Sequence, residues 1–309
     1  MVKNYTCLIL LLTVFTPLFI LSQEIKIFKA TDFDLKGKVK KCMVRTDYGK
    51  EEYEFNADGF LTKSVTRYND QDYDVTHYKY SDTELLEKRF EVYRDNVFDE
   101  AMSIANFYAI DTTSNKKVTE KIISYSKEFL GQNEHYYNAD GKLVRIVHSD
   151  NEGTDETKIE YTEVKGERTK TLTRNGVLLQ SVRTSKREEK DNGHQTVILT
   201  KNFIDGQPNT AVEEIKSEAG LLLLKTNFYF DTKTKQFTPE ISTTYFYDDK
   251  GMLSKTETKR GVQVEEKEFI YQFDGTENGN WVKEIVTPEN AYKTRQISYY
   301  KPEKLVVEE

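Results

Sequence analysis

The sequence predicts an all-β protein, a long antiparallel β-meander of repeated hairpins whose sheet is curled or solenoid-like. One observation is a short hairpin pattern that recurs along the chain. Another is a pair of interleaved series of turn signals. The third is composition, because the 309 residues are only 37% hydrophobic and 31% charged, yet 12% aromatic. Disordered chains are poor in aromatic residues, so the composition indicates a folded, thin sheet in which aromatic and charged side chains alternate.

The recurring pattern is aromatic-x-aromatic-[Asn/Asp]-x-x-Gly-x-Leu. It occurs at 53–61, 135–143 and 245–253, with His135 in the first aromatic position of the second copy. Aromatic residues at i and i+2 lie on one face of a strand. Asn or Asp followed three residues later by Gly suits a type I turn with a left-handed Gly. The predicted structural turn residues are Asn56, Asp58, Gly59, Asn138, Asp140, Gly141, Asp248 and Gly251.

Weaker copies fill the intervals between these three. Gly220 and Gly279 mark the turns of two such copies. Together the turn points define about nine hairpin units at intervals of roughly 25 to 31 residues, hence about eighteen strands. A second series of turn signals falls between them, and Asn175-Gly176 is its strongest member. Only segment 97–108 has a composition that also suits a short helix, and there we expect a strand.

The pattern resembles the YD-repeat (Rhs-like) family of secreted repeat proteins of Bacteroidetes-type bacteria. The nearest match is Tyr247-Asp248-Asp249-Lys250-Gly251-Met252-Leu253. The leading segment 34–39 (Asp-Leu-Lys-Gly-Lys-Val) and the closing segment 279–283 (Gly-Asn-Trp-Val-Lys) also resemble segments of that family. The resemblance implies an exported hairpin-repeat protein. The toxin role of large Rhs proteins is not implied, because the chain lacks a distinct C-terminal domain.

The first residues predict export. Lys3, an apolar run over 5–21 and Ser22 before Gln23 match a secretory signal peptide over 1–22. The remainder, 23–309, has no linker and is predicted to be a single β-hairpin repeat domain. We expect it in the periplasm, at the outer-membrane surface or outside the cell, with no membrane span after cleavage. Cys42 is then the remaining thiol, and its strand-like neighbours indicate a buried structural cysteine.

The sequence offers no recognisable catalytic, cofactor or metal site. The four histidines share no ligand spacing, and neither a nucleophile elbow nor a glycine-rich phosphate loop occurs. His135 replaces an aromatic residue of the pattern, which favours packing. The acidic segments 70–74 and 150–155 contain oxygen ligands suited to calcium, but they match no full loop pattern and are interpreted as solvated turns. We therefore expect no enzyme and no cofactor.

The aromatic residues are the most interesting candidates for ligand contact. Tyr78 and Tyr80, and likewise Tyr245 and Tyr247, are expected to form ladders along one sheet face. Such ladders stack on sugars or anchor protein partners. The alternative is a structural role, because the rings recur at the same repeat position and tyrosines pair across strands.

The function expected from the sequence is that of an exported, non-enzymatic scaffold or protein-interaction module at the bacterial cell envelope. One alternative is a carbohydrate-binding protein that uses a Tyr-rich sheet face. Another is a hydrolase whose paired carboxylates meet in the curled sheet. The partner is a protein or a glycan. Nucleic acid is not expected, because the net charge is −7 and no basic face is evident.

Overall fold

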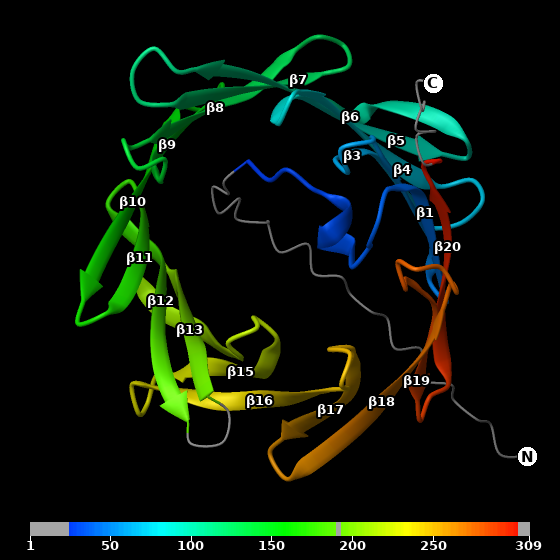
Figure 1. Cartoon of the computed structure of the whole chain (residues 1–309). Helices are drawn as coiled ribbons and strands as arrows, with labels where there is room; N and C mark the ends of the chain where they lie inside the picture. Colours follow the sequence, from blue (N-terminus) through cyan, green and yellow to red (C-terminus); the bar gives the residue numbers. More distant parts are fainter. Residues whose placement is uncertain (1–24, 190–192, 302–309) are drawn as a thin grey trace, which may run out of the picture.

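The computed structural model describes residues 25–189 and 193–301, and one antiparallel sheet of twenty strands dominates them (Figure 1). The predicted signal peptide lies outside the described residues. The strands are β1 Val39–Thr46, β2 Gly49–Phe55, β3 Leu61–Arg67, β4 Tyr73–Ser81, β5 Glu84–Arg94, β6 Val97–Asp111, β7 Lys117–Ser124, β8 Phe129–Tyr137, β9 Leu143–Ser149, β10 Thr154–Val164, β11 Glu167–Arg174, β12 Val177–Glu189, β13 Gly193–Ile204, β14 Gln207–Lys216, β15 Leu222–Asp231, β16 Gln236–Tyr247, β17 Leu253–Arg260, β18 Gln263–Phe273, β19 Trp281–Thr287 and β20 Ala291–Tyr299.

The sheet closes into a barrel. Each strand pairs with the next, and β1 also pairs with β20, with Cys42 opposite Ile297 and Val44 opposite Arg295. The all-β antiparallel meander is therefore confirmed, but the curled or solenoid-like form is wrong. Closure removes the two exposed strand edges that an open sheet would carry. A local hairpin pattern predicts each turn, but it contains no signal for whether the first and last strands meet.

The number of strands differs from expectation, whereas the structure of segment 97–108 agrees with it. There are twenty strands rather than about eighteen, because the nine hairpin units correspond to β2 to β19 and leave β1 and β20 uncounted. The segment 97–108, where a helix competed, lies within β6 and is a strand as expected. Its partner β5 supplies the backbone hydrogen bonds that decide between the two forms, with Phe90 opposite Ile104.

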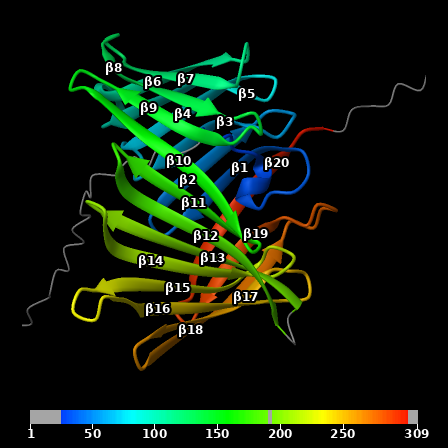
Figure 2. The ribbon, with the colours of Figure 1, turned by 90° about the vertical axis from the view of Figure 1, so that its left-hand side faces the viewer.

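The two series of turns lie at opposite ends of the barrel, as an antiparallel meander requires (Figure 2). The turn at 138–142 shows how the pattern works. The side-chain oxygen of Asn138 accepts hydrogen bonds from the backbone of Asp140 and Lys142, at 3.1 and 2.8 Å. Gly141 adopts φ +74° and donates its N–H to the carbonyl of Asn138. The end that carries such turns is called the pattern end below.

The same turn geometry recurs at the other copies of the pattern. In each of them the N–H of the glycine bonds to the carbonyl three residues earlier, and the side chain at that earlier position accepts a backbone hydrogen bond. The glycine and its carbonyl partner are Gly59 and Asn56, Gly220 and Ser217, Gly251 and Asp248, and Gly279 and Thr276, where the side-chain acceptor is instead Asp274. Asp58, like Asp140, supplies a backbone N–H at the third turn position.

Residues 25–38, called the inner segment, run inside the barrel (Figure 1). They include a short 3-10 helix, η1 Ala30–Phe33. The ring of Phe33 lies 4.4 Å from that of Tyr53, and Leu35 is buried in a cluster with Cys42 and Phe55. The strand side chains that contact the inner segment therefore face the lumen. Because successive side chains of a strand point to opposite faces, the residues between them form the outer face of the wall. The inner segment was not predicted, because it has no repeat and no strand periodicity.

A second cluster extends the core along the lumenal face of β5 to β11. It contains Leu85, Tyr108, Val118, Tyr137, Leu143, Ile146, Ile159 and Leu172, and Ile25 and Ile27 of the inner segment pack against it. The inner segment therefore supplies apolar contacts to the wall in a barrel whose sequence is low in aliphatic residues. Burial of this kind contributes about 25 cal/mol per Å² of apolar surface.

The strands that close the barrel also bind the inner segment. The amide side chain of Asn280 accepts from the N–H of Lys36 and donates to its carbonyl, both at 2.8 Å. Arg295 donates to the carbonyl of Phe33 at 2.9 Å and stacks 3.5 Å from the Trp281 ring centroid. The leading and closing segments that carried the family resemblance thus meet in space. Gly37 fits here because a Cβ would lie 2.3 Å from the side chain of Asn278.

Cys42 lies in this cluster, and its side chain is buried. Burial raises the pKa of the thiol to about 11, although Arg295 opposes the shift. Because the thiolate is the reactive form, we expect Cys42 to resist a thiol reagent such as DTNB at pH 8 until urea unfolds the barrel. Fast labelling of the folded protein at a rate typical of a free thiol would contradict this, and free cysteine provides the control.

Candidate functional site

The four tyrosines proposed as ligand contacts do not form an exposed ladder on the outside of the barrel. Tyr78 packs against Phe28 of the inner segment, with ring centroids 6.3 Å apart. The hydroxyls of Tyr80 and Tyr247 donate to the carbonyls of Leu61 and Leu222, each at 2.8 Å. These leucines each follow a turn glycine by two residues. The hydroxyls of Tyr80 and Tyr247 therefore tie neighbouring hairpins together, and Tyr78 packs the wall against the inner segment.

Tyr245 lies on the same lumenal face, opposite Thr256, and is half-buried. Burial and the nearby Glu214 carboxylate raise the pKa of its phenol. Since its neighbour Phe246 points outward and is exposed, the aromatic residues of this strand face both sides of the wall. A sugar-binding ladder of Tyr245 and Tyr247 would have to act from inside the barrel.

A polar cluster on the lumenal face surrounds Glu120 of β7. The carboxylate accepts hydrogen bonds from Tyr108 at 2.7 Å and from Asn106 and Asn133 at 2.8 Å each. Burial opposes ionisation of Glu120, but these donors and His135 outweigh it and hold its pKa at about 2. The carboxylate is thus a fixed, ionised acceptor. A general acid needs the opposite shift.

His135 lies next to this carboxylate and is almost completely buried. Its Nε2 is 3.8 Å from Oε2 of Glu120, and neither ring nitrogen makes a hydrogen bond within the described residues. His148 extends the cluster, since its Nδ1 lies 2.7 Å from the side-chain oxygen of Asn133. His135 is packed in the wall, as we expected from its aromatic position in the pattern. The neighbouring carboxylate could not be foreseen, because it comes from another hairpin.

The outer face of the wall carries rows of ion pairs. Glu52 lies between Lys41 at 2.8 Å and Arg67 at 3.0 Å, and hydrogen bonds from both lower its pKa. Lys255 likewise contacts Glu257 at 2.9 Å and Glu266 at 3.2 Å. Such pairs contribute about 0–1 kcal/mol each in water. A strand that faces lipid alternates apolar side chains outward instead, and a basic residue there costs about 2–4 kcal/mol.

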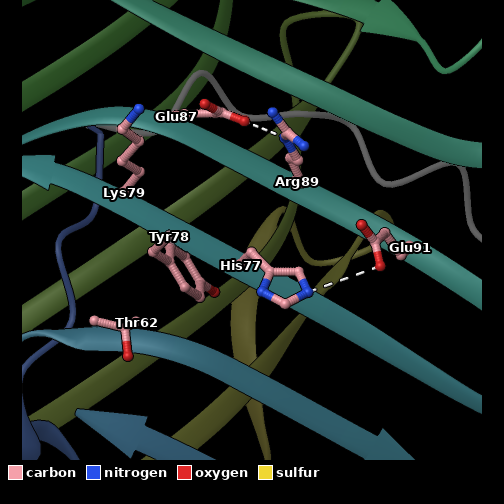
Figure 3. A pocket seen from close by; sticks show the side chains of 7 residues that line it. All are labelled: Thr62, His77, Tyr78, Lys79, Glu87, Arg89 and Glu91. Atoms are coloured by element: carbon pink, nitrogen blue, oxygen red, sulfur yellow. Dashed lines mark hydrogen bonds and ion pairs between the residues drawn. The ribbon is translucent and has the colours of Figure 1, made fainter. Parts of the chain in front are cut away.

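A shallow groove of about 350 Å³ opens on this outer face over β4 and β5 (Figure 3). The charged side chains that line it are His77 and Lys79 of β4 and Glu87, Arg89 and Glu91 of β5. The register places His77 opposite Arg89 and Lys79 opposite Glu87, so alternate residues of two neighbouring strands converge on one patch. Thr62 and Tyr78 complete its lining.

The two ends of the groove differ in charge pairing. Glu91 accepts from Tyr125 at 2.7 Å and from Tyr93 at 3.0 Å, and its carboxylate lies 3.7 Å from Nε2 of His77. Burial and this carboxylate together raise the pKa of both phenols, so they stay protonated donors. At the other end Arg89 contacts Glu87, whereas Lys79 is exposed and has no ion pair among the described residues.

An aromatic cluster borders the groove at the Glu91 end. Tyr73 and Tyr93 stack at 4.7 Å, and Phe98 contacts Tyr93 and Tyr125 at 5.6 and 5.0 Å. The cluster fixes the two phenols that hold Glu91 in place. The groove therefore combines a positioned carboxylate, a half-exposed imidazole and guanidinium, and a free ammonium.

The acidic turns act as caps of the backbone. Asp72 accepts the N–H of Asp95 at 3.0 Å, and Asp150 accepts the N–H groups of Glu152 and Gly153 at 2.8 and 3.0 Å. Within residues 25–189 and 193–301 no group of three or more His, Cys, Asp or Glu side chains is arranged to hold a metal ion. In the same ranges no helix is long and apolar enough to cross a membrane.

Sequence reasoning missed the groove. The groove residues show only the alternation of side-chain types that any strand with two different faces shows. Their convergence on one patch depends on the register between β4 and β5. A sequence signal did exist, because His77 and Lys79 alternate with the lumenal tyrosines on β4, while Glu87, Arg89 and Glu91 keep the same period on β5. Pairing the two strands through the turn at 82–83 would have brought these charges together.

Fold and site together define a closed antiparallel β-barrel with a charged outer wall. No protein-family model matches the chain, and no curated protein matches it. Among solved structures, a porin-like protein from Bacteroides uniformis superposes with a TM-score of 0.32 at 9% sequence identity, covering 85% of this chain and 99% of that one.

Proposed function

We propose that this chain is an exported, non-enzymatic interaction protein of the bacterial cell envelope whose closed barrel presents the outer groove to a protein partner. The observation that carries the proposal is the uneven charge pairing of the groove. Within the groove Glu87 and Glu91 each contact a basic side chain, whereas Lys79 is exposed with no ion pair among the described residues and the imidazole of His77 is half-exposed. A partner carboxylate placed there would gain a charge-assisted hydrogen bond. The charged wall supports a barrel that works in water.

The hydrolase alternative receives no support from either polar site. Glu87 and Glu91 are four residues apart on β5, and a strand rises about 3.3 Å per residue, so their backbones lie about 13 Å apart. Glycosidase carboxylates lie about 5 Å or roughly 6.5–9.5 Å apart. Glu120 is ionised and fully hydrogen-bonded. No pair of carboxylates in these two sites has the separation and the opposite pKa shifts that acid and base roles require.

Carbohydrate binding is the second candidate, and the aromatic cluster beside the groove favours it. Phe98 is exposed and contacts Tyr93 and Tyr125, the two phenols that donate to Glu91. An apolar ring face beside a few polar groups is the lining that polar ligands with apolar faces use. On this hypothesis the sugar contacts come from the outer wall rather than from Tyr245 and Tyr247.

A charge-reversal experiment tests the proposal. The double variant Lys79→Glu/Arg89→Glu is compared with Lys259→Glu, which reverses an exposed charge elsewhere on the outer wall. Each immobilised barrel is incubated with solubilised envelope proteins of the source cells, and bound proteins are quantified by mass spectrometry. We expect a partner that the wild type and Lys259→Glu retain and that the groove variant loses by about tenfold, which corresponds to about 1.4 kcal/mol.

Equal capture by all three proteins would contradict the proposal, and circular dichroism confirms that each variant folds. The same three proteins and the variant Phe98→Ala on a glycan array separate the two candidates. Binding of a glycan that Phe98→Ala and the groove variant both abolish, with no protein captured, would replace the protein partner by a sugar.

A further inference from the structure

The two ends of the barrel differ in the polarity of their turns. More than half of the exposed large apolar side chains in the described ranges lie at or beside turns of the end opposite the pattern end. Six of them, each at a different turn of that end, are named the collar: Tyr48, Tyr68, Val97, Ile204, Val262 and Tyr292. At the pattern end, within the described residues, the corresponding set is Val164, Phe246 and Phe273.

The collar is not the ordinary scatter of apolar residues on a protein surface. Single exposed apolar residues are normal, but turns favour Gly, Asn, Asp, Ser and Pro. Tyr48 and Val262 sit in turns themselves and are 91% and 99% exposed. Their side chains contribute nothing to the core, so folding does not explain them. A set of protruding apolar tips around one rim points to contact with something apolar outside the barrel.

We propose that the collar docks the barrel, end on, into the interface of a lipid bilayer without crossing it. The tips stand on separate hairpins around a closed ring, with polar residues between them. A protein partner, including a second copy, would have to match the position of every tip. A fluid lipid interface accepts each tip wherever it stands. Tyrosine, found at Tyr48, Tyr68 and Tyr292, is also a residue that prefers the membrane–water interface.

The charges near the collar favour zwitterionic lipid. Collar turns carry both signs, with Arg45 and Asp47 beside Tyr48 and Lys259 and Arg260 beside Val262. The whole chain has a net charge of −7, so attraction to anionic headgroups is not expected to add to binding. This inference goes beyond the proposed function, because the groove lies on the wall and the collar on the rim.

Vesicle flotation tests the inference. The chain from Gln23 onward contains every described residue and omits the apolar run 5–21, which would bind lipid by itself. It is mixed with phosphatidylcholine vesicles and floated in a density gradient. The collar variant Tyr48→Ser/Ile204→Ser/Val262→Ser is compared with the matched variant Val164→Ser/Phe246→Ser/Phe273→Ser at the pattern end. We expect the wild type and the pattern-end variant to float and the collar variant to lose about tenfold or more in partitioning, since each tip buries apolar area.

Three results would overturn the inference. The first is a wild type that stays at the bottom of the gradient at millimolar lipid. The second is equal flotation of the wild type and both variants. The third is a self-associated wild type in analytical ultracentrifugation that the collar variant converts to monomer, because the collar would then bind a second copy. Urea unfolding of all three proteins confirms that the variants keep the fold, as expected for side chains that are exposed.

Discussion

Glu120→Gln is expected to lower the free energy of unfolding by about 3 kcal/mol at pH 7. In the folded barrel the Glu120 pKa is about 2, against an ordinary value of 4.5. A pKa that is lower in the folded state contributes stability above the unfolded value and loses it as pH falls through the folded value. Glutamine has one acceptor oxygen for the amides of Asn106 and Asn133, so it also leaves a buried donor without a partner.

The pH dependence of this difference identifies its cause. Wild type and Glu120→Gln should differ fully above about pH 5, and the electrostatic part of the difference should disappear between about pH 4.5 and pH 2. Urea unfolding followed by tyrosine fluorescence measures it. Glu84→Gln is the control, because Glu84 forms an exposed pair with Lys116 at 3.5 Å that should contribute less than about 1 kcal/mol. A difference independent of pH would show that Glu120 acts only through packing.

The sequence predicted the local structure of this barrel well and its long-range structure poorly. Asn138 and Gly141 determine a turn through bonds within five residues, so pattern reasoning recognises such turns at any copy. The closure of β1 on β20 joins residues more than 250 positions apart, as with Cys42 and Ile297. That contact depends on the number, twist and tilt of all the strands between them, and no local motif encodes it.

The same distinction separates the predicted from the unpredicted site residues. The tyrosines at 78, 80, 245 and 247 were recognised because they repeat, and residues that repeat with a fold are the ones that build it. Tyr80 and Tyr247 bond to a neighbouring hairpin, and Tyr78 packs against the inner segment. The groove and the cluster around Glu120 do not repeat. They arise where particular side chains on adjacent strands happen to differ from the repeat, and the pairing register places them together.

Asn280→Ala is expected to lower the free energy of unfolding by about 3 kcal/mol and to release the inner segment from the lumen. Asn280 is buried, and it makes two hydrogen bonds to the backbone of Lys36 and one, at 2.7 Å, to the hydroxyl of Tyr299. Alanine leaves the N–H and the carbonyl of Lys36 without these partners. Lys36 is an exposed residue and these hydrogen bonds are part-buried, so each of the three lost bonds costs about 0.5–1.5 kcal/mol.

Two measurements separate release of the inner segment from general loss of stability. Urea unfolding gives the shift of the midpoint, and trypsin cleavage after Lys36 or Lys38 in the folded protein reports exposure of the segment. Asn151→Ala, in an exposed turn, should change neither. Asn280→Asp keeps the acceptor for the Lys36 N–H but loses both donated bonds, so its effects should be intermediate. If Asn280→Ala resisted trypsin as well as the wild type does, Arg295 and the apolar contacts would be sufficient to hold the inner segment. In that case the closing strands would fix the inner segment by packing, and the Gly-Asn-Trp segment would have no specific part in closing the barrel.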